Sequence, residues 1–201
     1  MAAPGDHRHR HLVERHGLIV IVALGESIVA IGAAGDITVD WGLAGTALVV
    51  MALIVGLWWA YFDHDAEAAG AALVAATGAE QPRLGRDVYS YLHIPLVLGI
   101  VMAAVGIHDA LVHADEPLDP LVAAALAGGV ALFLAGLVAI RLRCGTLRPT
   151  PAAWAALAVA VAMVPGGRHL DAWAAVAVLA AAVVGLDLAE RARPPVLEST
   201  P

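Results

Sequence analysis

Apolar residues in this chain occur in long continuous runs, not in the alternation that is typical of half-buried strands. A helix needs about 20 apolar residues to cross a lipid bilayer, and most of the runs approach that length. Because backbone polar groups in lipid must be paired within the segment, continuous runs favour helices. We predict membrane-spanning helices at 17–35, 42–62, 88–108, 119–141, 148–165 and 171–189.

These six segments predict an all-α fold, a polytopic membrane helix bundle formed by one transmembrane domain over residues 1–193. The fifth segment is short and begins near two prolines, so a re-entrant segment is the alternative to a full span. The stretch 63–87 is expected to be a loop whose apolar part lies along the membrane interface or forms a small helix. The tail, 194–201, is expected to be disordered.

The arginines give an independent prediction of how the bundle is oriented. Ten of the chain's 11 basic residues fall on one side of the predicted spans, whereas the other side has several acids and only Arg168. Because cytoplasmic loops are enriched in basic residues, six spans with both ends in the cytoplasm fit this pattern best.

Composition excludes the other broad classes of protein. Of the 201 residues, 61% are hydrophobic and 14% are charged, against about 45–50% apolar and about 25% charged in an ordinary soluble domain. The net charge is -7 and there is no basic tract, so a nucleic-acid partner is not expected. The single cysteine, Cys144, rules out a disulfide within the chain.

Glu26 is the most unusual residue of the first run, GLIVIVALGESIVAIGAA. It lies nine residues past Gly17, which at about 1.5 Å per residue places it about 13 Å into a hydrocarbon core about 30 Å thick. A charged acid there costs at least a few kcal/mol, so we expect Glu26 to face the protein interior as a functional residue. The alternative is a Glu26 that only fixes helix packing. Ser27 follows it, but adjacent residues diverge by about 100° on a helix.

His93 is the second ionisable residue expected inside the membrane. It lies in VYSYLHIPLVLG, with Tyr89 one turn earlier on the same helix face. The following proline, Pro95, frees a backbone carbonyl and allows a polar niche. Since Glu26 and His93 would differ in depth by only about 6 Å, they are expected to pair directly or through water. A histidine bonded to a neighbouring backbone group is the equally weighted alternative.

Other polar residues are predicted at the cytoplasmic mouth of the bundle. His11, Glu14 and Arg15 precede the first run and Asp63 ends the second, where charged side chains commonly anchor at head groups. Asp63, His64 and Asp65 are adjacent on a predicted loop and cannot easily converge on one ion. We therefore expect no tightly bound metal and no cofactor.

The stretch HLVERHGLIVIVALGES, from His11 to Ser27, resembles a signature of the low temperature requirement protein A (LtrA) family of bacterial multi-pass membrane proteins. WWAYFD and YSYLHIPLVLGI match that family more loosely. The resemblance implies an inner-membrane protein connected with growth in the cold, and it raises the importance of Glu14, Arg15, Gly17, Gly25, Glu26, Asp63 and His93. It also implies a truncated member, because the usual N-terminal membrane portion with its acidic, Phe-rich motif is not found here, or else a chain that pairs with a partner subunit.

Three functions remain open at this point. The first is proton-linked transport or permeation of a small solute through a pocket that contains Glu26 and His93. The second is a structural membrane protein for cold adaptation that moves no solute, alone or as a homo-oligomer. The third, a membrane-embedded enzyme, is disfavoured because Ser27 has no evident base at helical spacing and no phosphate-binding motif occurs. The chain is therefore expected not to be an enzyme.

Overall fold

The computed structural model describes residues 6–33, 41–145 and 148–192. These residues are almost entirely helical and form no β-strand, so the all-α prediction is confirmed. The elements are α1 (Asp6–Ala33), α2 (Trp41–Ala60), the π-helical segment η1 (Tyr61–Asp65), α3 (Ala66–Ala75), α4 (Glu80–Arg86), the π-helical segment η2 (Asp87–Leu92), α5 (His93–Val112), α6 (Pro120–Cys144), α7 (Pro151–Gly166), the 3₁₀ segment η3 (Gly167–His169) and α8 (Ala172–Arg191). The predicted tail, 194–201, lies outside the described residues.

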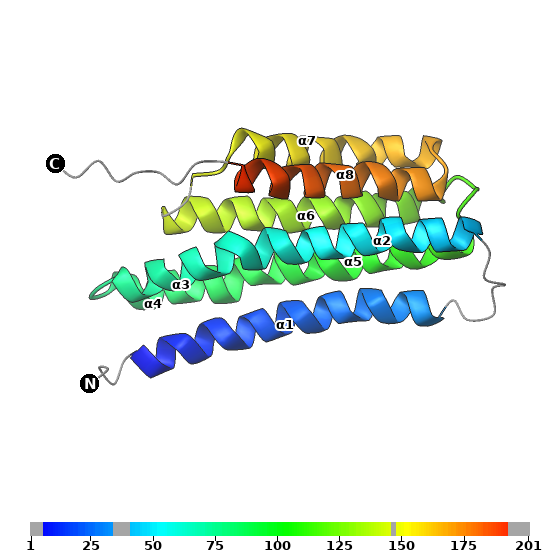
Figure 1. Ribbon diagram of the computed structural model, residues 1–201. Helices are drawn as coiled ribbons and strands as arrows, with labels where there is room; N and C mark the ends of the chain where they lie inside the picture. Colours follow the sequence, from blue (N-terminus) through cyan, green and yellow to red (C-terminus); the bar gives the residue numbers. More distant parts are fainter. Residues whose placement is uncertain (1–5, 34–40, 146–147, 193–201) are drawn as a thin grey trace.

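In the part of the chain that the structure describes, six long helices run side by side along one axis and correspond to the six predicted segments (Figure 1). α5 packs against α6, α6 against α7, and α8 against α2 and α7. α1 packs mainly against α5 at the edge of the bundle (Figure 1). The start of α1, the start of α5 and the end of α8 all lie at one end, which we call the α1-start end (Figure 1).

Four helical stretches are long and apolar enough to cross a membrane. Among the described residues these are Trp41–Ala75, Glu80–Val112, Pro120–Cys144 and Ala172–Arg191. α7, the fifth predicted span, has 16 residues, which at about 1.5 Å each is shorter than a hydrocarbon core of about 30 Å. The predicted membrane character of the bundle thus rests on these four stretches.

The expected loop at 63–87 is wrong, because most of it is helix. α2 continues through η1 into α3, and α4 continues through η2 into α5. A π-helical segment keeps the chain helical while shifting its register, so the helices extend past the apolar runs. Of the two alternatives for the apolar part, α3 is the small helix.

Helix starts follow ordinary capping chemistry. The Asp119 carboxylate accepts a hydrogen bond from the backbone N–H of Leu121 before α6, and the Thr150 hydroxyl accepts one from Ala153 N–H before α7. Proline at the first helical position of both helices fits because that N–H has no partner in a helix. The fifth predicted segment therefore begins at Pro151 rather than at residue 148.

α5 and α6 approach closely where two glycines face each other. A Cβ added to Gly129 would lie 2.5 Å from the Gly99 carbonyl oxygen and 2.5 Å from the Ala103 nitrogen. A Cβ on the adjacent Gly128 would meet only the end of Met102, at 3.9 Å. Small residues at helix crossings let backbones touch in lipid, and here Gly129 has that role.

Candidate functional site

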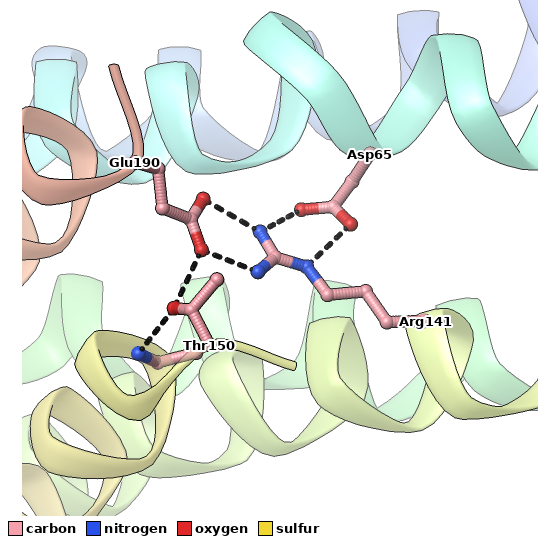
Figure 2. Close-up of polar contacts among 5 residues, drawn as sticks. Asp65, Arg141, Thr150 and Glu190 are labelled. Atoms are coloured by element: carbon pink, nitrogen blue, oxygen red, sulfur yellow. Dashed lines mark hydrogen bonds and ion pairs between the residues drawn. The ribbon is translucent and has the colours of Figure 1, made fainter. Parts of the chain in front are cut away.

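A buried ion-pair network joins four elements at the α1-start end (Figure 2). Arg141 of α6 donates from Nε to Asp65 Oδ1 at 2.7 Å and from Nη2 to Asp65 Oδ2 at 2.6 Å. It also donates to both carboxylate oxygens of Glu190, on α8. The Thr150 hydroxyl donates to Glu190 Oε1 at 3.0 Å and accepts from the Ala153 N–H (Figure 2). We call Asp65, Arg141, Thr150 and Glu190 the Arg141 centre.

Because the Arg141 centre is buried, each of its charges depends on its partner for stabilisation. The side chains of Arg141 and Asp65 are 3% and 2% exposed, so neither charge is well solvated. A buried ion pair offsets its desolvation only with good geometry and extra hydrogen bonds, and the two-pronged contact supplies both. The Arg141 centre thus holds η1, α6, α7 and α8 together.

Asp187 lies one turn before Glu190 on α8. Its side chain is 5% exposed, and its Oδ2 atom has no hydrogen-bond partner among the described residues. Four residues later on the same face, Arg191 donates to Asp63 Oδ2 at 2.9 Å and lies over the Trp59 ring, 4.3 Å from its centre. Asp187 is therefore a buried acid beside a set of paired charges.

A second polar cluster lies where η1 meets α5. The Tyr61 hydroxyl is 2.9 Å from His93 Nε2, and His93 Nδ1 is 2.8 Å from the Val88 carbonyl oxygen. Because a carbonyl can only accept, Nδ1 carries a proton, and in the neutral ring Nε2 accepts from Tyr61. Both side chains are buried, so the pair is shielded from water.

Two further rings complete what we call the His93 cluster: Tyr61, His93, His16 and Tyr89. The Tyr89 ring stacks on His93 with centres 5.3 Å apart, and the His16 ring of α1 meets His93 edge-on at 5.0 Å. The hydroxyl of Tyr89 is buried without a hydrogen-bond partner among the described residues. Like Asp187, it is a polar group that the described part of the chain leaves unsatisfied.

A groove of about 540 Å³ runs from the His93 cluster along α1 and α5. It is lined by His16, Ile19, Tyr89, Ser90, His93, Ile94, Val97, Leu98 and Val101. The histidines, Tyr89 and Ser90 form its polar end, and Ile19 of α1 with aliphatic residues of α5 forms the remainder. This arrangement can hold a small or elongated molecule with one polar group.

The segment η1 connects the two polar centres. Tyr61 begins it and bonds to His93, while Asp65 ends it and bonds to Arg141. π-helical segments inside longer helices are frequent at functional sites. A shift of η1 would therefore alter both centres at once.

Glu26 is not where the sequence analysis places it. Its side chain is exposed on the outer face of α1, beside Val22 and Val29, which are 72% and 62% exposed. No hydrogen bond or ion pair between it and His93 is found in the described ranges. α1 begins at Asp6 and brings His16 level with His93, so Glu26 lies ten residues, or about 15 Å, farther along the helix. Interior placement of Glu26 and its pairing with His93 are therefore wrong.

The other three membrane candidates are buried. Ser27, His93 and Tyr89 are 1%, 5% and 3% exposed, and the ring stacking places Tyr89 and His93 on one face as expected. His93 also bonds to the backbone of Val88, which was the alternative left open. A functional role for each of these residues stays a prediction.

The predicted mouth residues do not form one site. His11 and Glu14 face each other at 3.6 Å on the exposed surface of α1, and Arg15 is exposed there too. Asp63 instead pairs with Arg191 of α8. Glu14 lines a second groove, of about 560 Å³, between α1 and the η1 and α3 region. A functional role for these residues stays a prediction, because they share no common geometry.

Sequence reasoning missed Tyr61, Asp65, Arg141, Asp187 and Glu190 as site residues. Arg141 counted only toward the basic side of the topology, and Asp187 and Glu190 resembled ordinary polar residues at a helix end. An acid at Asp187, before the end of an apolar run, was the one available signal.

Residues 4–188 match the family described as bacterial low temperature requirement A protein (LtrA). An uncharacterised protein of Rhizobium meliloti (strain 1021) is 36% identical to this chain over 131 residues. That alignment covers 63% of this chain and 31% of the relative, so the chain spans less than a third of the relative's length. No solved structure is significantly similar to the chain. The family match covers most of the sequence, and the chain therefore belongs to the bacterial LtrA family.

Proposed function

We propose that this chain acts in the bacterial inner membrane as a multi-pass protein for proton-linked transport or permeation of a small solute. The observation that carries the proposal is the buried Tyr61–His93 hydrogen bond between a π-helical segment and the start of α5. Intramembrane ionisable groups are expensive to keep and commonly mark proton or solute pathways. A histidine ring can bind and release a proton at its nitrogen atoms, which suits a proton-linked step.

The surroundings of His93 support the same proposal. A groove of about 540 Å³ opens beside it, with space for a small solute. The helices on both sides contain π-helical segments, η1 and η2, and such segments are frequent at functional sites. In this view, protonation of His93 changes its bond to Tyr61 and moves η1, which alters access to the groove.

The second candidate is a structural protein of cold adaptation that moves no solute. The Arg141 centre favours it, because a buried arginine paired with two acids from other elements suits a helix anchor. This candidate predicts that changes at His93 alter stability without any effect on flux.

A flux measurement separates the two candidates. The purified chain is reconstituted into liposomes that contain a pH-sensitive dye, and proton entry is followed after a pH gradient is imposed. We expect proton entry above that of protein-free liposomes, and its loss in His93→Gln. His108→Gln is the matched control, because His108 is exposed toward the other end of α5. No entry in the wild type, or equal entry in His93→Gln, would contradict the proposed function.

A further inference from the structure

Asp187 is a buried acid that the His93 cluster does not use. Asp187 is only 5% exposed, and its Oδ2 atom has no hydrogen-bond partner among the residues that the structure describes. Keeping a carboxylate ionised in that position is costly, because one oxygen is buried without a protein hydrogen-bond donor. The site therefore favours neutralisation of the negative charge by a cation small enough to bind at the carboxyl oxygen itself.

The charged groups around Asp187 come from three elements. Glu190 and Arg191 lie on its own helix, Asp63 faces it from η1, and Arg141 faces it from α6. The neighbouring helices α2 and α7 have no titratable side chain between Trp41 and Ala60 or between Pro151 and Gly166. Both guanidinium groups already bond to other acids. Acids outnumber bases here, which favours uptake of one positive charge.

A proton fits this position better than a metal ion. Among the described residues, no three His, Cys, Asp or Glu side chains converge closely enough to hold a metal. A proton needs only one carboxyl oxygen, and Oδ2 is such an atom. We propose that the Asp187 carboxyl is a proton-binding site whose occupancy controls the bond between Tyr61 and His93. This role rests on the proposed transport function.

The geometry also indicates how a proton on Asp187 affects the hydrogen bond of His93. Arg191 lies four residues after Asp187, so the two side chains share one helix face. With a proton on Asp187, Arg191 bonds to Asp63 and holds η1 against α8. Without it, the Asp187 carboxylate competes with Asp63 for Arg191, and the hold on η1 weakens. Because Tyr61 lies in η1, loss of the proton changes the bond to His93.

Infrared spectroscopy tests proton binding directly. The reconstituted wild-type chain is compared across a pH series, with unlabelled aspartate and with aspartate labelled with ¹³C in the carboxyl group. We expect a carbonyl band of a protonated carboxylic acid in the region of a poorly hydrogen-bonded acid, shifted by the label and absent in Asp187→Asn. Asp171→Asn, at the exposed start of α8, is the matched control and should keep the band. If no such band shifts with the label, or if Asp187→Asn keeps it, the proposal is overturned.

The same variants tested for flux separate this proposal from the proposed function. We expect Asp187→Asn to fold, because asparagine mimics the protonated acid in size, and to lose proton entry into liposomes. Proton entry that persists in Asp187→Asn but disappears in His93→Gln would overturn a role for Asp187 and leave the proposed function standing. A labelled band without any proton entry in the wild type would support the proton site and contradict the transport function. If Asp187→Asn does not fold, a wild type without a label-shifted band still overturns the proposal, and a shifted band that Asp171→Asn keeps supports a buried protonated aspartic acid.

Discussion

Arg141 on α6 and Asp65 in η1 form a two-pronged ion pair across 76 residues of sequence, with both side chains almost fully buried. The same guanidinium binds Glu190 of α8. One side chain thus ties together three separate elements of the bundle, and its loss leaves two acids without their main partner.

Replacing Arg141 by methionine should lower the free energy of unfolding by about 3–5 kcal/mol, because it leaves buried charges uncompensated. Chemical denaturation in detergent micelles measures the change. Arg143→Met is the control on the same helix: Arg143 pairs with Asp87 and Glu80 but is 31% exposed, so its loss should cost at most about 1 kcal/mol. Equal losses for the two variants would show that the Arg141 centre is not an anchor.

Removing the Tyr61 hydroxyl should lower the stability of the protein, because His93 loses its hydrogen-bond donor. Tyr61→Phe leaves His93 Nε2 buried without a hydrogen-bond donor, which should cost about 1–3 kcal/mol of stability. In Tyr91→Phe the ring is 60% exposed, and no comparable loss is expected. Thermal unfolding of the two variants in parallel provides the comparison, and an unchanged Tyr61→Phe protein would argue against the hydrogen bond.

Adjacent glycines of α6 should respond in opposite directions. Gly129→Ala places a methyl group 2.5 Å from the backbone of α5, and overpacking of this kind costs about 1–3 kcal/mol or more. Gly128→Ala meets only a flexible methionine and should be neutral or stabilising by up to about 1 kcal/mol. Unfolding midpoints measured in one detergent compare them. A tolerated Gly129→Ala would mean that α5 and α6 lie farther apart than described.

Glu26 and Ser27 should differ although they are neighbours. Glu26→Leu removes an acid from the exposed apolar face of α1, and a charged acid at the centre of a membrane helix costs on the order of 3 kcal/mol, so bilayer stability should rise by up to that amount. Ser27→Leu should destabilise, because Ser27 is 1% exposed and the larger side chain overpacks. Unfolding assays in lipid bicelles measure both changes, and a destabilised Glu26→Leu would indicate a partner for Glu26.

The sequence predicts much of the fold, because long apolar runs specify helices wherever lipid is the solvent. It does not predict where those helices end. α1 begins at Asp6 because a helix can continue through polar residues outside the apolar run, and η1 and η2 leave no mark in the hydrophobic pattern. The direction of the Glu26 side chain depends on which face of α1 meets α5, and the apolar run alone does not specify that face.

The candidate site was predictable only in part. His93 and Tyr89 are recognisable because they lie four residues apart within one apolar helix. Arg141 is not, since its partners Asp65 and Glu190 lie 76 and 49 residues away and only the packing of α6 against η1 and α8 brings them together. In the sequence alone, an arginine that becomes buried cannot be distinguished from a surface arginine at the end of a helix.

Proton flux through the Tyr61→Phe variant tests the central claim most directly, that the hydrogen bond between Tyr61 and His93 is part of a proton-linked pathway. The variant keeps the ring and removes only the hydroxyl, so a change in flux reports the hydroxyl itself. We predict that proton entry into liposomes falls toward the level without protein, while Tyr91→Phe keeps the wild-type rate. A Tyr61→Phe chain that folds and conducts protons like the wild type would contradict the account.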